Sequence, residues 1–268
     1  MRLVEVYRKE CSILKSKCTN KINKVLGYAI SILIWLLIWH FTDLIIDKDI
    51  FLPYPLDVFK VLINDLLPSD VFWSSILHSV INILLGFLLG TIIGVLLASV
   101  SSMSRIIKAF LWFPIVVLKS VPVASFVILL LLWVVPEQLS IVIPMMVVIP
   151  ILYINTLSSI EMTDKKIIEM ADLYKVPFIR KLMYIYVPSV MPAVISACSL
   201  AIGMAWKSGI AAEIIGLAKN TIGNELYKTK IYLMTTELFG WTFVIILLSI
   251  LCEYLLKKVV HYLEVKGE

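Results

Sequence analysis

The sequence predicts an all-α polytopic membrane protein, and three observations support this fold class. Apolar residues make up 60% of the 268 residues and charged residues 16%, against about 45–50% and 25% in soluble domains. The apolar residues gather in runs of about 20, the length that a helix needs to cross a bilayer. Lysine and arginine concentrate between alternate runs. This composition excludes an ordinary soluble enzyme, which would expose large apolar patches to water, and a disordered regulator.

Six transmembrane helices are predicted within a membrane domain of residues 25–262. They cover residues 25–42, 76–100, 107–135, 139–157, 190–206 and 238–256. The fifth is short, and we expect it to extend at either end. The third is too long for one straight span, and Pro114 and Pro122 predict a break or kink within it. The first is expected to be a signal anchor, because its apolar run is too long for a cleaved signal peptide.

The distribution of basic residues predicts that both termini are cytoplasmic. Seven Lys and Arg residues lie in the basic N-terminal segment 1–24. With six spans, 17 Lys and Arg fall on the inner side and 5 on the outer side, as the positive-inside rule requires. Residues 263–268 form a cytoplasmic tail, and the amphipathic segment 55–67 is expected to lie on the outer membrane surface. No basic stripe alternates with exposed aromatic residues, so nucleic acid is not an expected partner.

Small residues recur at four-residue spacing in the second span, at Gly86, Gly90, Gly94 and Ala98. In lipid, such spacing makes a flat groove that lets another helix approach closely. One interpretation is packing within the chain. The other is that this helix lines a pathway or a subunit interface.

The chain carries no motif for catalysis or for binding a cofactor. No glycine precedes a lysine, so there is no nucleotide phosphate-binding loop, and the three histidines are too scattered to suggest a metal site. The four cysteines form no C-x-x-C pair. We therefore expect no enzyme activity, cofactor or metal in this chain, which leaves transport or scaffolding.

The inner loop 158–187 is polar, charged and patterned as two short helices. Asp164 is the predicted N-cap of a helix over 165–174. Pro177 is expected to start a second helix, and Pro188 to open the next span, where its missing N–H costs little. On the first helix, apolar residues fall near one face and predict an apolar knob, formed by Ile167, Ile168, Ala171 and Tyr174.

This loop resembles the coupling loop of binding-protein-dependent ABC importer permeases. The family pattern is Glu-Ala-Ala, three residues, Gly, about nine residues, then aliphatic-x-aliphatic-Pro. Glu169 and Ala171 match its first and third positions, and Pro188 matches its end. Lys175 stands where the family has its glycine. Because that glycine is left-handed, a conformation that costs other residues about 1 kcal/mol, either the turn is strained or a following proline reshapes it.

The resemblance extends over roughly residues 25–262 and is most specific for the nitrate/sulfonate/taurine-type permeases. It implies the type I (MetI-like) ABC importer permease fold, with six transmembrane helices, in the cell membrane of a prokaryote. The segments that carry it, besides the loop and the second span, are Leu52-Pro-Tyr-Pro55, Lys119-Ser-Val-Pro122, Ala205-Trp206, Ala212-Glu213-Ile-Ile-Gly216 and Gly223.

The resemblance also implies partners and a mechanism. A separate ABC ATPase subunit would hold ATP and receive the loop, an extracytoplasmic solute-binding protein would deliver the solute, and a second permease copy would complete a homodimer. The residues expected to couple to the ATPase are Asp164, Ile168, Glu169, Ala171, Lys175 and Pro188.

Five residues are candidates for the pathway or its gate: Lys119, Pro122, Trp206, Lys207 and Glu213. Lys119 could be structural at the proline break, line the pathway, or extend to the membrane surface. Lys207 and Glu213 could form a local pair or belong to an outer gate. If both lysines line the pathway, an anion such as a sulfonate, taurine or nitrate is favoured.

Other functions stay open on the sequence alone. The same importer class could carry a thiamine precursor or another heterocycle. A self-contained secondary transporter would need inverted repeats or a relay of intramembrane carboxylates, and we find neither. A membrane scaffold would bind a partner without moving solute.

Overall fold

The computed structural model describes residues 26–27, 30–31, 33–45 and 52–266, with side chains to residue 258. The predicted N-terminal segment 1–24, parts of the first predicted span and the end of the predicted tail lie outside the described residues. Within the described ranges every regular element is a helix, so the all-α fold class is confirmed.

Four of the described helices are long and apolar enough to cross a membrane. They are α3 (Asp70–Met103), α6 (Pro136–Glu161), α9 (Val187–Gly216) with the short elements before it, and α11 (Thr235–Lys266). The bent pair α4–α5 gives a fifth if it is counted as one span. The first predicted span is represented by the shorter apolar helix Leu33–Ile45. By length and composition, the described residues thus account for four or five of the six predicted spans.

The third predicted span is broken, as its prolines indicate. Helix α4 (Arg105–Ser120) and helix α5 (Val123–Leu130) meet at an angle of 102°. Between them Val121 is extended, with ψ 132°, because the residue before a proline avoids the helical region. Pro122 is the N-cap of α5. Pro114, by contrast, lies inside α4 without ending it.

The fifth span is longer than its apolar run predicts. α9 continues past residue 206 to Gly216 and ends where Leu217 adopts the left-handed conformation, with φ 56°. Polar side chains at Lys207 and Glu213 interrupt the hydropathy pattern, but alanines between them favour helix. Both residues, predicted to follow the span, therefore lie on its helix.

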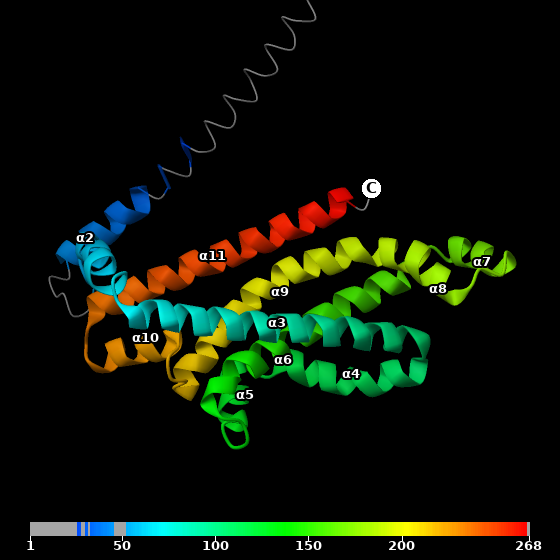
Figure 1. Cartoon of the computed structure of the whole chain (residues 1–268), viewed down its shortest axis with the longest axis horizontal. Helices are drawn as coiled ribbons and strands as arrows, with labels where there is room; N and C mark the ends of the chain where they lie inside the picture. Colours follow the sequence, from blue (N-terminus) through cyan, green and yellow to red (C-terminus); the bar gives the residue numbers. More distant parts are fainter. Residues whose placement is uncertain (1–25, 28–29, 32, 46–51, 267–268) are drawn as a thin grey trace, which may run out of the picture.

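The core lies where α3, α6 and α9 pack against one another (Figure 1). Trp206 of α9 is 1% exposed, and its indole N–H donates to the Ile245 carbonyl of α11 at 3.2 Å. This bond joins α11 to the same core.

The small residues of α3 lie buried in the contact with α6. A Cβ built on Gly86 would come within 2.4 Å of the Ile141 carbonyl oxygen, and one on Gly94 within 2.8 Å of the Leu152 Cβ. Gly90 meets Met145 and Val148 in the same way, and Ala98 is fully buried. The backbones of α3 and α6 can approach this closely only because these side chains are absent or small.

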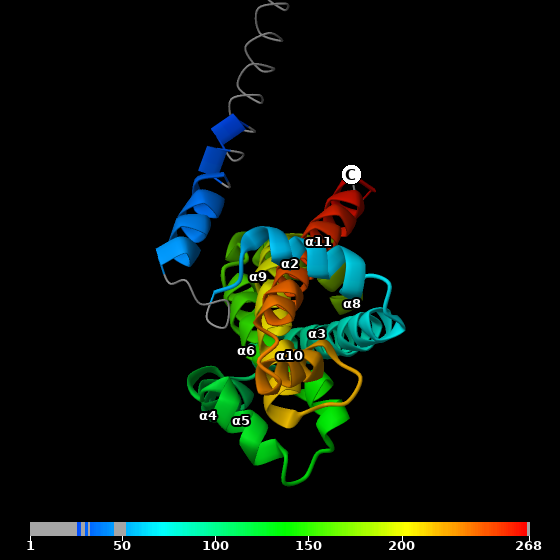
Figure 2. The same ribbon diagram turned by 90° about the vertical axis from the view of Figure 1, so that its left-hand side faces the viewer.

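The shorter helices cap the two ends of the bundle. At one end lie α2 (Pro55–Val61), the one-turn π-helix η1 (Leu62–Leu66) and α10 (Ile222–Ile231). At the other end lie α7 (Lys165–Leu173) and α8 (Phe178–Lys181) (Figure 1). Figure 2 shows α2 lying across the start of α11. Phe59 and Phe243 make this contact, with ring centroids 5.4 Å apart.

Candidate functional site

The 158–187 loop forms two short helices and leads directly into α9. α7 spans Lys165–Leu173, α8 spans Phe178–Lys181, and the π-helical turn η2 (Leu182–Tyr186) joins α8 to α9. The Asp164 side chain caps α7 by accepting a hydrogen bond from the Lys166 N–H at 2.9 Å. An ion pair between Asp172 and Lys181 ties α7 to α8. The loop is therefore a defined structural unit.

The turn between α7 and α8 is strained at Lys175. This residue has φ 51°, the left-handed conformation that glycine adopts without cost. The Val176 N–H donates to the Ala171 carbonyl at 2.9 Å, which closes the helix end. Of the two alternatives for this position, the strained turn is the one observed, and Pro177 follows it as the N-cap of α8.

The residues of the predicted apolar knob differ in exposure. Ala171 is 5% exposed and Ile168 is half-buried, whereas Ile167 and Tyr174 are exposed. Glu169 and Pro188 are exposed as well. The exposed apolar side chains of α7, α8 and the turn between them are Ile167, Met170, Leu173, Tyr174, Phe178 and Ile179. We call these six residues the α7–α8 surface. Apolar side chains exposed on an otherwise polar, charged segment are typical of a partner-binding site.

A second polar site lies at the opposite end, around the fully buried Glu213. Its Oε2 accepts hydrogen bonds from the Ser79 hydroxyl of α3 at 2.9 Å and from the Gly223 N–H of α10 at 3.1 Å. The Ser79 oxygen in turn accepts from the Ile222 N–H at 2.9 Å. We call Ser79, Glu213, Ile222 and Gly223 the Glu213 cluster.

The Glu213 cluster satisfies the start of α10. The first N–H groups of a helix have no partner within it, and a carboxylate is favourable at that positive end. Thr221 completes the cap by accepting from the Asn224 N–H at 3.3 Å. The approach requires glycine at 223, because a Cβ there would lie 2.4 Å from the Glu213 Cβ.

The remaining candidate pathway residues are not gathered into one site. Trp206 is a core residue in this structure. Lys207 is exposed, and the local pair with Glu213 is not formed, because Glu213 is engaged with Ser79 and Gly223. Lys119 lies exposed in the last turn of α4, next to the break at Pro122. There a cation interacts favourably with the helix C-terminus.

Ser79, which connects α3 to Glu213 and to the start of α10, was not predicted from the sequence. The sequence offers one indication of it, since Ser75 and Ser79 are four residues apart and place hydroxyls on one face of an otherwise apolar run. Both serines are fully buried. The partners of Ser79 could not be predicted, because Glu213 and Ile222 lie more than a hundred positions away in the sequence.

Comparisons with known proteins agree with this architecture. A crystal structure described as that of an amino acid ABC transporter with histidines matches with a TM-score of 0.58 and 16% identity, covering 73% of this chain and 94% of that chain. At this identity the match shows a shared fold. No curated protein matches the chain. The family described as "Binding-protein-dependent transport system inner membrane component" matches residues 86–266. Because this match covers more than half of the sequence, the chain belongs to that family of inner membrane transport components.

Proposed function

We propose that this chain forms the solute pathway of an ATP-driven ABC importer and couples to a separate ATPase through the 158–187 loop. Members of the family are permease components that are not catalytic themselves, and binding-protein-dependent transport implies an ATPase and a solute-binding protein as partners. The observation that carries the proposal is the α7–α8 surface, six exposed apolar residues on a capped, ion-paired unit at one end of the bundle.

The coupling step would work by rigid-body displacement. The ATPase would bind the α7–α8 surface in a cleft and move it when two ATPase subunits close on ATP. The helix from Phe178 to Gly216 is continuous over 39 residues, which is about 58 Å at 1.5 Å per residue. It would carry the displacement from the α7–α8 surface to the Glu213 cluster and α10. The break between α4 and α5 is a place where the bundle could hinge.

The orientation follows from the same proposal. The 158–187 loop and both termini would be cytoplasmic, and α2 and α10 would face outward. Figure 1 supports this arrangement, since the end of α11 and the α7–α8 segment point toward the same end of the bundle. A second permease copy would form a homodimer, because one chain offers one coupling loop and two ATPase subunits need two.

For the solute we propose a small molecule with an anionic group, such as a sulfonate, taurine or nitrate, as in the nitrate/sulfonate/taurine-type permeases. Lys119 and Lys207 support this class, because both are exposed and neither has an acidic partner within 4 Å among the described residues. Uptake of taurine and nitrate into liposomes tests the role of Lys119. Lys119→Met should reduce uptake of the transported solute. Equal uptake by the variant and the wild type would show that Lys119 does not line the pathway. A heterocyclic solute, the alternative, would be taken up while neither anion is.

The coupling role is tested with two exposed apolar residues. Leu173 of the α7–α8 surface is 82% exposed, and Met103 at the α3–α4 turn is 74% exposed. Leu173→Glu should reduce both the co-purified ATPase and vanadate-sensitive uptake at least tenfold, because a charge would be buried in the interface. Met103→Glu, the matched control, should change each less than twofold.

Three results would contradict the proposal. ATPase binding that is unaffected by Leu173→Glu would show that the ATPase binds outside the α7–α8 surface. Uptake driven by an ion gradient in the chain alone would indicate a secondary transporter. Stable partner binding without any flux would indicate a scaffold.

A further inference from the structure

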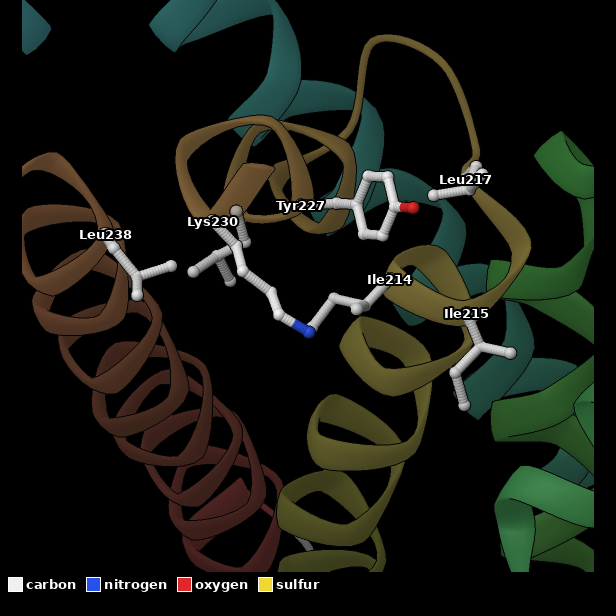
Figure 3. Close-up of a pocket in the computed structure, with 7 residues that line it drawn as sticks. Ile214, Ile215, Leu217, Tyr227, Lys230 and Leu238 are labelled. Carbon is white, nitrogen blue, oxygen red and sulfur yellow. The ribbon is translucent and has the colours of Figure 1, made fainter. Parts of the chain in front are cut away.

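An open cavity lies between α9, α10 and α11, at the end of the bundle opposite the α7–α8 surface. Its volume is about 350 Å³. Its walls are mainly apolar, from Ile214, Ile215 and Leu217 of the α9 end and Leu238 of α11, while Tyr227 and Lys230 enter from α10. Figure 3 shows the Lys230 side chain reaching across the cavity from α10 toward α9.

Lys230 is the cationic residue among those that line the cavity. Its neighbour Lys228, on the same helix, pairs with Glu225 at 2.7 Å. No carboxylate of the described residues lies within 4 Å of the Lys230 amine. Lys230 is exposed and the walls beside it are mainly apolar, so solvent rather than a protein group compensates its charge. An anion that entered the cavity would therefore gain a partner that the protein itself does not supply.

The cavity is preformed by its backbone. Leu217 and Leu233, which follow the ends of α9 and α10, both adopt the left-handed conformation, with φ 56° and 57°. Such a conformation is unusual for a bulky residue and persists only where the surroundings enforce it. The Glu213 cluster fixes the other end of α10 against α3 and α9. Ligand binding would thus require little free energy to order the backbone around the cavity.

We propose that this cavity binds an amphiphilic monoanion, with its charged group at Lys230, a hydrogen bond from the Tyr227 hydroxyl, and its apolar body against Ile214, Ile215 and Leu238. Its size is at the small end of ligand pockets, which run from about 300 to 1,000 Å³. Two sources supply this chemistry, namely a water-soluble organic anion and the headgroup region of an anionic phospholipid. Binding at the cavity requires neither the ATPase nor the α7–α8 surface, so its test is independent of transport.

The charge contribution is tested with the full-length chain in phosphatidylcholine nanodiscs and radiolabelled octanoate as the probe. Lys230→Gln should weaken octanoate binding at least tenfold. Lys228→Gln, two residues away on the same helix, should change it less than twofold, because Lys228 does not line the cavity. Octanoate binding that survives Lys230→Gln, or that both variants weaken equally, would overturn the proposal.

The shape contribution is tested by filling the cavity. Leu238→Trp should abolish octanoate binding and leave the thermal unfolding midpoint in the nanodisc within two degrees of wild type. Undiminished binding in a folded Leu238→Trp protein would place the ligand elsewhere and overturn the proposal. Should this variant unfold, Ile215→Trp provides the same test from the opposite wall.

Native mass spectrometry distinguishes the two sources. Phosphatidylglycerol retained by the wild type and by Lys228→Gln, but lost from Lys230→Gln, identifies a lipid headgroup as an occupant. Lys230-dependent octanoate binding without such retention identifies a water-soluble anion. The absence of both overturns the proposal.

Discussion

At the scale of single residues, two backbone positions explain how the ends of the bundle are built. Lys175 adopts a conformation that suits glycine, whereas Gly223 is required for a close approach and not for its backbone angle. The first stores strain in a turn next to the α7–α8 surface. The second permits a buried carboxylate to reach the start of α10. The two positions therefore make opposite predictions for substitution.

Lys175→Gly should stabilise the chain by about 1 kcal/mol, because glycine removes the cost of the left-handed conformation. Lys166→Gly, inside α7, should destabilise it by about the same amount, since glycine is unfavourable within a helix. Thermal unfolding of both variants in nanodiscs measures whether each substitution raises or lowers the stability. A loss of stability in Lys175→Gly would show that the lysine side chain contributes more than its backbone costs.

Gly223→Ala should destabilise the chain by about 1–3 kcal/mol, the usual cost of an overpacked core. The added Cβ would meet Glu213 at 2.4 Å and the backbone nitrogen of Ile214 at 2.7 Å. Gly203→Ala is the control, because a Cβ there meets nothing within 4 Å and the residue lies inside α9. That variant should be neutral or slightly stabilising. Equal unfolding midpoints for the two alanine variants would contradict the contact described for Gly223.

At the scale of elements, the sequence predicts the features that neighbouring residues determine. It does not predict the features that depend on contacts between distant segments. The N-cap at Asp164 and the break before Pro122 follow from neighbouring residues, so the sequence predicts them directly. The end of α9 does not follow, because Lys207 and Glu213 reduce the hydropathy of a segment that tertiary contacts keep helical. Ser79 was missed for the same reason, since its partners come from α9 and α10.

The packing of α3 on α6 should tolerate no large side chain at the small-residue positions. Gly86→Leu should prevent the two helices from meeting, because even a Cβ would press on the Ile141 carbonyl. Leu85→Ala, one position away and 43% exposed, should be nearly neutral. The monodisperse fraction in size-exclusion chromatography measures the outcome. A folded Gly86→Leu chain would mean that α3 and α6 can separate without loss of the bundle.

At the scale of the whole molecule, the two sites are distant but share one helix. The α7–α8 surface lies at one end and the Glu213 cluster at the other (Figure 1). The family fold could be predicted, because the motifs of the 158–187 loop and the span pattern are local. Length and composition identify four or five spans among the described residues, and the first predicted span lies partly outside them.

Breaking the shared helix should separate ATPase binding from transport. Leu200 lies midway along α9 and is 62% exposed. Leu200→Pro should interrupt the helix and reduce vanadate-sensitive uptake at least tenfold, while the co-purified ATPase stays within twofold of wild type. Leu200→Ala should leave both unchanged. Normal uptake by the proline variant would mean that the displacement reaches the Glu213 cluster by another route.

The unbroken course from Phe178 to Gly216 also fixes what kind of sequence change this segment can accept. An α-helix turns about 100° for each residue. One inserted or deleted residue would therefore rotate the carboxylate of Glu213 away from α3 while leaving the end at α8 where it was. Substitutions on the lipid-facing side of the helix do not change the direction in which Glu213 points. Insertions and deletions should therefore disturb the helix from Phe178 to Gly216 more than substitutions do.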